Sequence, residues 1–148
     1  MEHEILLGKP NRTPALVVNG FMFNMELDQL EIRLEELSSV VDFFVLVESN
    51  YSSHEEPKAL HYASNKGRFQ RFEEKIVHVV VDHPPPKGLG RFAPDTFMRN
   101  SIARLGLLKV EAKLKEDGRS FHLDDLVIVN DADEIPSLET VYFLRHYT

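Results

Sequence analysis

The chain has 148 residues, of which 43% are apolar and 28% are charged, and it contains neither Cys nor Trp. These proportions fit one globular domain with a sizeable core, and they exclude a collagen, a disordered tail and a disulfide scaffold. With 24 acidic and 17 basic residues the net charge is −7, which disfavours nucleic acid as a partner because a phosphate backbone would meet a repulsive field.

Four short apolar blocks predict the strands of a sheet. They are rich in Val, Ile or Phe and do not alternate with polar residues, which is typical of parallel strands covered on both faces. In chain order the blocks are residues 15–18, 43–47, 76–81 and 126–129. The longest uninterrupted apolar run is 43–47, far short of the roughly 20 residues of a membrane helix, so no membrane segment is expected.

Helical patterns separate these blocks. After the first block, four leucines at spacings of three, four and three share one face of an amphipathic helix. They are Leu27, Leu30, Leu34 and Leu37. After the second block, residues 64–74 predict a shorter helix with Phe69 and Phe72 facing inward, although Gly67 weakens the pattern.

A longer helix is expected after the third block, and another after the fourth. The longer helix begins near Pro94 or Asp95 and stops at Gly118, and the last helix begins near Ser137. The inward face of the longer helix is expected to carry Met98, Ile102, Leu105 and Ala112.

The alternation of strand and helix predicts an α/β fold with a mostly parallel sheet and right-handed crossovers. We expect residues 1–148 to form a single domain. Two stretches, 49–63 and 82–93, are longer than ordinary loops. Long loops at the carboxyl ends of parallel strands are where such folds bind ligands.

The strongest chemical signal follows the fourth block. Asp131, Asp133 and Glu134 place three carboxylates within four positions directly after a predicted buried strand. Such crowding is unfavourable unless a cation or hydrogen-bond donors compensate it, which suggests a divalent metal that also binds a substrate diphosphate. The alternative is a solvated acidic turn in which one aspartate caps the next helix.

Two weaker candidates lie elsewhere. Glu48 ends the second block, where a carboxylate can accept hydrogen bonds from a nucleotide base or ribose, but it can equally be the first solvated residue after the strand. Arg99 and Asn100 lie in the long helix, pointing away from its core face. Arg99 can bind a phosphate, although a solvated or paired surface Arg is the commoner case.

Other sites are disfavoured. The seven His residues show no metal-ligand spacing, and His78 within a predicted strand is better explained as a hydrogen-bonded core residue than as a ligand. No P-loop or complete dinucleotide fingerprint is present.

Several stretches together resemble glycosyltransferase family 17, in the expected order from about Val17 to the end of the chain. The motifs are Asn24-x-Glu26-x-Asp28 with Arg33, Glu36-Leu37, Val41-Asp42-x-Phe44-Val45-x-Val47-Glu48-Ser49-Asn50, Pro57-Lys58-x-Leu60, Lys75-Ile76-Val77 and Asp131-Ala132-Asp133-Glu134-Ile135-Pro136. Each motif is loose, but the ordered set is specific.

The resemblance implies a GT-A-like, Rossmann-like nucleotide-sugar-binding fold and a UDP-sugar donor, UDP-N-acetylglucosamine. It implies transfer with inversion, in a β-1,4 linkage, to a β-linked mannose of an N-glycan, which is the glycan acceptor. It implies an Asp-x-Asp motif for Mn²⁺ or Mg²⁺, in which Asp133 is expected to bind the metal directly and Asp131 to lie near the metal or ribose. Arg99 and Asn100 would face the donor, and Glu48 would lie near the base.

Three further expectations accompany this resemblance. No general base for inversion can be assigned from the sequence. Because the chain ends one predicted helix after the Asp-x-Asp motif, we expect a donor-binding portion truncated before the acceptor half. The acidic opening Met1-Glu2-His3-Glu4 lacks the features of a secretory signal, so the chain alone suggests a cytoplasmic location, whereas eukaryotic family members suggest the Golgi.

Two alternatives to a metal-dependent transferase stay open. The first is a non-catalytic sugar-nucleotide-binding module that needs a partner to complete the acceptor site. The second is a phosphatase of the haloacid-dehalogenase type, which also uses Asp-x-Asp after a strand. That motif normally follows the first strand, whereas here it follows the fourth predicted strand.

Overall fold

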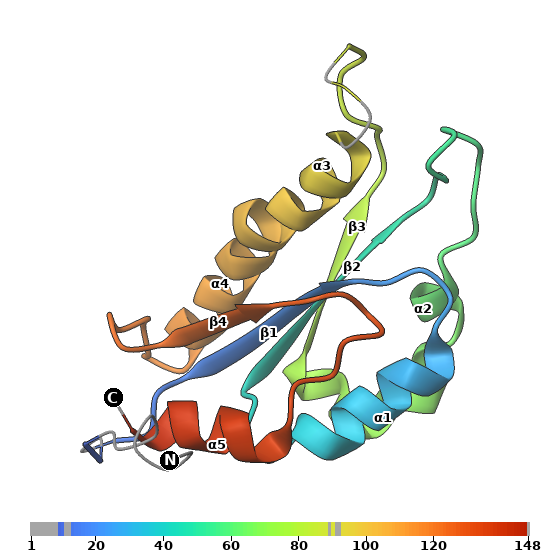
Figure 1. Cartoon of the computed structure of the whole chain (residues 1–148). Coiled ribbons are helices and arrows are strands. Elements are labelled where there is room, and N and C mark those ends of the chain that lie inside the picture. Colours follow the sequence, from blue (N-terminus) through green and yellow to red (C-terminus); the bar gives the residue numbers. More distant parts are fainter. Residues whose placement is uncertain (1–8, 11–12, 89, 91–92, 148) are drawn as a thin grey trace, which may run out of the picture.

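The computed structural model shows four parallel strands with helices on both sides (Figure 1). It describes residues 9–10, 13–88, 90 and 93–147, so the acidic opening at residues 1–4 lies outside the described part. The strands are β1 (Val17–Met22), β2 (Phe43–Ser49), β3 (Ile76–Val81) and β4 (Leu126–Val129), in the spatial order β3-β2-β1-β4. The predicted α/β fold with a parallel sheet is confirmed.

One face of the sheet is covered by α1 (Leu27–Leu37), α2 (His61–Ser64), the 3-10 helix η2 (Lys66–Lys75) and α5 (Leu138–His146). The predicted leucine stripe of α1 is inward, with Leu30, Leu34 and Leu37 buried. The helix predicted at 64–74 is present as η2, a 3-10 helix that starts at Lys66 because the backbone of Asn65 is not helical and separates it from α2. Phe69 is buried and Phe72 packs against the same cluster, as predicted.

The opposite face is covered by α3 (Ala93–Ser101), the π-helical segment η3 (Ile102–Leu107) and α4 (Leu108–Glu116). The predicted inward positions Leu105 and Ala112 are wrong, since both are exposed. A π segment has a wider turn than an α-helix, so the inward face advances by one residue. The buried positions of η3 and α4 are therefore Ile102, Gly106, Val110 and Leu114.

Two glycines let η3 approach the sheet closely. A Cβ on Gly106 would lie 2.3 Å from Cγ1 of Val45, and a Cβ on Gly20 would lie 2.4 Å from Cγ2 of Ile102. Neither distance leaves room for a side chain. The stop at Gly118 is also confirmed, because this residue has a φ of +68° directly after the end of α4.

The expectation that every strand is covered on both faces fails for β4. This edge strand alternates between half-buried and exposed residues, and Val127 and Val129 are 44% and 45% exposed. Leu126 and Ile128 pack against the cluster on the α1 and α5 side. None of the helices in the described part of the chain has the length and apolar character of a membrane span.

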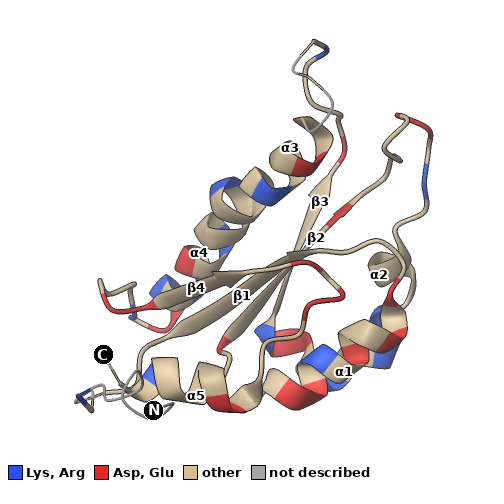
Figure 2. Ribbon diagram, viewed as in Figure 1, with Lys and Arg blue, Asp and Glu red and all other residues tan. Residues whose placement is uncertain are grey.

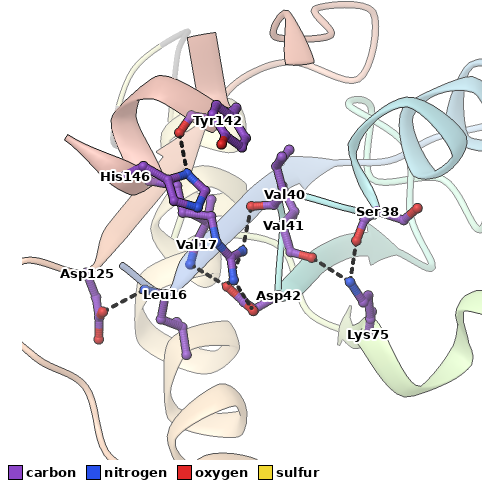
Figure 3. A network of polar contacts seen from close by, with 11 residues as sticks. Leu16, Val17, Ser38, Val40, Val41, Asp42, Lys75, Asp125, Tyr142 and His146 are labelled. Carbon is purple, nitrogen blue, oxygen red and sulfur yellow. Dashed lines mark hydrogen bonds and ion pairs between the residues drawn. The ribbon is translucent and has the colours of Figure 1, made fainter. Parts of the chain in front are cut away.

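A polar network fixes the amino edge of the sheet (Figure 3). The Asp42 carboxylate accepts the Val17 N–H at 2.8 Å and pairs with Arg145 of α5 at 3.0 Å. Asp125 accepts the Leu16 N–H at 2.8 Å, and Lys75 donates to the Val41 carbonyl at 2.9 Å. Asp42 and Asp125 therefore hold strands and helices together at this edge.

Candidate functional site

A cleft of about 690 Å³ lies at the opposite, carboxyl edge of the sheet. It is bounded by the segment between β1 and α1, the segment after β2, the first turns of α3 and the turn after β4. The crossover between β1 and β2 lies on one face, whereas the long connection from β3 to β4 lies on the other. The cleft is therefore at the point where the strand order reverses, the usual ligand site of an open α/β sheet.

Asp131 and Asp133 both line this cleft, as their spacing predicts. Oδ1 of Asp131 pairs with Nη2 of Arg99 at 2.5 Å, and both side chains are a little over 40% exposed. Asp133 is exposed and makes no hydrogen bond or ion pair with any described residue. The turn that follows β4 is acidic (Figure 2), and α3 carries one basic residue, Arg99, and one acidic residue, Asp95.

Internal hydrogen bonds close the turn that carries the two aspartates. Glu134 N–H donates to the Asp131 carbonyl, and Asp131 N–H donates to Oε2 of Glu134, both at 3.1 Å. Nδ2 of Asn130 donates to the Glu134 carbonyl at 2.7 Å. Glu134 thus shapes the turn, and the helix cap belongs to Ser137, whose hydroxyl accepts the Thr140 N–H.

Arg33 lies beneath this turn and is completely buried. Its guanidinium donates to the carbonyls of Asp131, Ala132 and Glu134 at 2.7, 3.1 and 2.8 Å. It also donates to the side-chain oxygens of Asn19 and Asn130 at 2.8 and 3.0 Å. Burial lowers the pKa of Arg33 to about 10, against the opposing effect of Glu134 and Asp133, so it stays charged at neutral pH.

The signal for Arg33 was available in the sequence. It lies within the leucine stripe of α1, three residues after Leu30 and four before Leu37, so it interrupts an apolar face with a charge. The family motif also contains it, but no role follows from the motif. A buried arginine requires acceptors, and four of its five acceptors are 97 to 101 residues away along the chain.

Of the predicted pair Arg99 and Asn100, only Arg99 lies at the cleft. Arg99 lines the cleft through its pair with Asp131. Asn100 is exposed and is not one of the residues that line the cleft. The predicted donor contact of Arg99 therefore has a suitable position, whereas that of Asn100 stays a prediction without a geometric basis.

Glu48 is placed away from the cleft. Its side chain is 1% exposed, and its oxygens accept the N–H groups of Tyr62 and Ala63 at 3.0 and 3.1 Å and pair with Nε2 of His78 at 2.9 Å. Burial alone would raise the pKa of Glu48, but the hydrogen bonds from His78, Tyr62 and Ala63 outweigh it and lower the pKa. The structure does not bring Glu48 to the aspartates, and His78 is a hydrogen-bonded core residue as expected.

The sequence analysis gave no role to the other wall of the cleft, although the family motifs contain its residues Asn24 and Lys58. Nζ of Lys58 donates to Oδ1 of Asn24 at 2.6 Å, and burial lowers the pKa of Lys58 despite the acidic groups of Glu48 and Glu26. The Tyr51 hydroxyl lies 3.9 Å from the sulfur of Met98. Lys58 and Arg99 give this cleft a cation on each wall, and Tyr51 adds an aromatic ring.

The two aspartates fit a metal that is only partly held by protein. Among the described residues, no group of three or more His, Asp and Glu side chains could hold an ion. An ion bound by one or two carboxylates instead leaves positions for the oxygens of substrate phosphates. Asp133 offers exposed oxygens to the cleft, and Asp131 shares its carboxylate with Arg99, so the donor set is compatible with that arrangement.

Comparisons with known proteins give a consistent result. Residues 6–148 match the model of glycosyltransferase family 17. The chain is 34% identical over 141 residues to the β-1,4-mannosyl-glycoprotein 4-β-N-acetylglucosaminyltransferases of Rattus norvegicus and Homo sapiens, and 33% identical to that of Mus musculus. These alignments cover 93% of this chain but 25% of each relative, so the chain spans about a quarter of their length. No solved structure matches the chain.

Proposed function

This chain belongs to glycosyltransferase family 17, and from that premise we propose that its cleft binds UDP-N-acetylglucosamine with a divalent metal ion. We further propose that it serves the transfer named by its mammalian relatives, the addition of N-acetylglucosamine to a mannose of a glycoprotein. The observation that carries the proposal is the meeting of Asp131, Asp133 and Arg99 at the point of strand reversal. A Golgi location of the enzyme belongs to the same proposal.

The chemistry accounts for these residue types. Breaking the bond between sugar and phosphate develops negative charge on the leaving diphosphate. Asp133, and Asp131 beside it, would hold Mn²⁺ or Mg²⁺, which supplies stabilisation of that charge. Arg99 would donate its planar fork of N–H groups to a phosphate oxygen and exchange its carboxylate partner for the donor.

The wall that carries Tyr51 suits the nucleoside of the donor. Tyr51 offers an aromatic ring, and the Asn24 and Ser52 side chains add polar groups at the same cleft. With the diphosphate at the acidic turn, the nucleoside would extend toward this wall. Inversion also requires a base that takes the proton from the attacking mannose hydroxyl, and the described residues of the cleft do not identify it.

A calorimetric titration of UDP, with and without Mn²⁺, tests the proposal. Wild-type affinity is expected to rise by about a hundredfold with Mn²⁺, because the ion contributes several kcal/mol of charge stabilisation, and Asp133→Ala is expected to lose that rise. Asp124→Ala is the matched control, since it removes the same charge at the amino edge of the sheet. Equal, metal-independent affinities in wild type and Asp133→Ala would contradict the proposal.

A turnover assay separates an enzyme from a binding module. Release of UDP from UDP-N-acetylglucosamine in the presence of a mannose-terminated glycan supports a transferase. Metal-dependent binding without any release supports the sugar-nucleotide-binding module. Incorporation of phosphate at Asp131 from a phosphate ester would instead support the phosphatase.

A further inference from the structure

Arg33 makes contacts that are concentrated on one element. Four of its five hydrogen-bond acceptors belong to residues 130–134, namely the Asn130 side chain and the carbonyls of Asp131, Ala132 and Glu134. The fifth is Asn19 of β1, which also donates to the Asn130 side chain at 3.0 Å. The guanidinium carbon lies 4.4 Å from the centre of the Phe21 ring, which fixes its plane from β1.

In this arrangement the backbone carbonyls of the turn and the carboxylates of its two aspartates lie on different sides. The backbone carbonyls of Asp131, Ala132 and Glu134 face the buried guanidinium, whereas the carboxylates of Asp131 and Asp133 line the cleft. A guanidinium is suited to this because its donors are fixed in one plane, so several carbonyls are held at once. A lysine ammonium in the same place has one donor atom and cannot reach both the three turn carbonyls and the side-chain oxygens of Asn19 and Asn130.

The same residue also bears on the charge of the site. Two aspartates and Glu134 lie within four positions, and repulsion between them disfavours a common orientation. A buried positive charge directly beneath them lowers that repulsion, and burial protects the interaction from screening by salt. Asp133 is exposed and makes no hydrogen bond or ion pair with the described residues, so its oxygens can bind a ligand in the cleft.

From these observations we propose that Arg33 is a positioning residue that presents Asp131 and Asp133 to the metal and diphosphate, although it does not touch either. The inference rests on the proposed function. It adds that the affinity of the site depends on a residue of α1 that lies outside the cleft. Outer partners of metal ligands typically change metal affinity by about tenfold to a hundredfold when they are mutated.

A double-mutant cycle of Arg33→Lys and Asp133→Ala in the full chain tests this role, with UDP and Mn²⁺ as probes. Arg33→Lys is expected to lower the UDP affinity in Mn²⁺ by at least tenfold and to leave the metal-free affinity unchanged. In the Asp133→Ala background the same substitution is expected to have no further effect, because the ligand that Arg33 positions is absent. If Arg33 had only a structural role, Arg33→Lys would lower the UDP affinity equally in the wild-type and Asp133→Ala backgrounds, and equally with and without Mn²⁺.

Two further variants control for a loss of stability and for a failure of Arg33→Lys to fold. Val141→Ala removes buried side-chain volume from α5, away from the cleft, and should preserve the Mn²⁺ dependence at a comparable loss of stability. Asn130→Ala removes one of the four acceptors that the turn offers to Arg33, together with the bond from Asn130 to the Glu134 carbonyl, and replaces Arg33→Lys in the cycle if the latter does not fold.

The outcomes separate this inference from the proposed function. A strong effect of Asp133→Ala together with a wild-type Mn²⁺ dependence of folded Arg33→Lys overturns the role of Arg33 alone. An equal effect of Arg33→Lys in both backgrounds overturns it as well. If Asp133→Ala binds UDP and Mn²⁺ as wild type does, the proposed function fails, and the positioning role fails with it.

Discussion

The ends of β2 and β4 present the same pattern in the sequence and opposite environments in the structure. Each apolar strand runs into carboxylates at the carboxyl edge of the sheet. At the end of β2, Glu48 is buried and accepts hydrogen bonds from α2 and β3. After β4, Asp133 is exposed at the cleft, and Asp131 forms an ion pair with Arg99 in the same cleft.

The difference comes from the segments that follow each strand. β2 lies inside the sheet, and the chain after it returns so that the first turn of α2 donates two N–H groups to Glu48. β4 lies at the edge, and the turn after it is bound from below by Arg33. A carboxylate at a strand end is thus structural or available to ligands according to the donors that the next segment brings.

The largest expected effect is on stability, at the end of β2. Glu48→Ala leaves the donors of Tyr62, Ala63 and His78, which are buried or half-buried, without an acceptor and should lower the free energy of unfolding by about 3 kcal/mol. The affinity of the folded variant for UDP and Mn²⁺ should stay at the wild-type value. Urea unfolding and calorimetry measure the two quantities. A stable variant that has lost nucleotide affinity would place Glu48 in the donor site.

The next largest effect is on binding, at the acidic turn. Arg99→Ala should weaken UDP binding in Mn²⁺ by about tenfold through loss of a charged hydrogen bond to phosphate, with uridine affinity unchanged. Stability should change by no more than about 0.5 kcal/mol, because the pair with Asp131 is half-exposed. Arg104→Ala, an exposed arginine on the following turns, is the control. Unchanged UDP affinity in Arg99→Ala would remove Arg99 from the donor site.

The smallest expected effect concerns pH. The pKa of Glu48 is lowered in the folded protein, so its contribution to stability is present above its ordinary pKa of about 4.3 and is lost as the pH falls through the lowered value. Glu48→Gln should therefore lose less stability than wild type between pH 6 and pH 3. Denaturant midpoints across this range measure the difference. Parallel curves for the two proteins would show that the Glu48 carboxylate does not contribute.

Much of this fold follows from local sequence patterns. The Val-rich and Ile-rich blocks at 76–81 and 126–129 coincide with β3 and β4, and the leucine spacing of α1 fixes its buried face. The first strand extends beyond its predicted block to Met22, because Asn19 and Gly20 interrupt the apolar run without ending the strand. The shifted face of η3 could not be read from periodicity, since a π turn breaks the spacing of 3.6 residues.

The site was predictable where chemistry and chain position coincide. Asp131 and Asp133 carry their signal in one short segment after a strand. Glu48 and Arg33 depend on partners 14 to 101 residues away in the sequence. The leucine stripe of α1 indicates that Arg33 is buried, but no local pattern identifies its acceptors, and none reports the burial of Glu48. Glu48 is buried and Asp133 is exposed because different segments pack against the two strand ends.

Anomalous diffraction at the manganese edge, from crystals of the full chain grown with UDP and Mn²⁺, tests whether the turn after β4 is the metal site. We expect a manganese peak in the cleft, bound to the Asp133 carboxylate and to phosphate oxygens of UDP, with Glu48 still buried against Tyr62 and His78. A peak away from both aspartates, or UDP bound at Glu48, would contradict the division between the two strand ends.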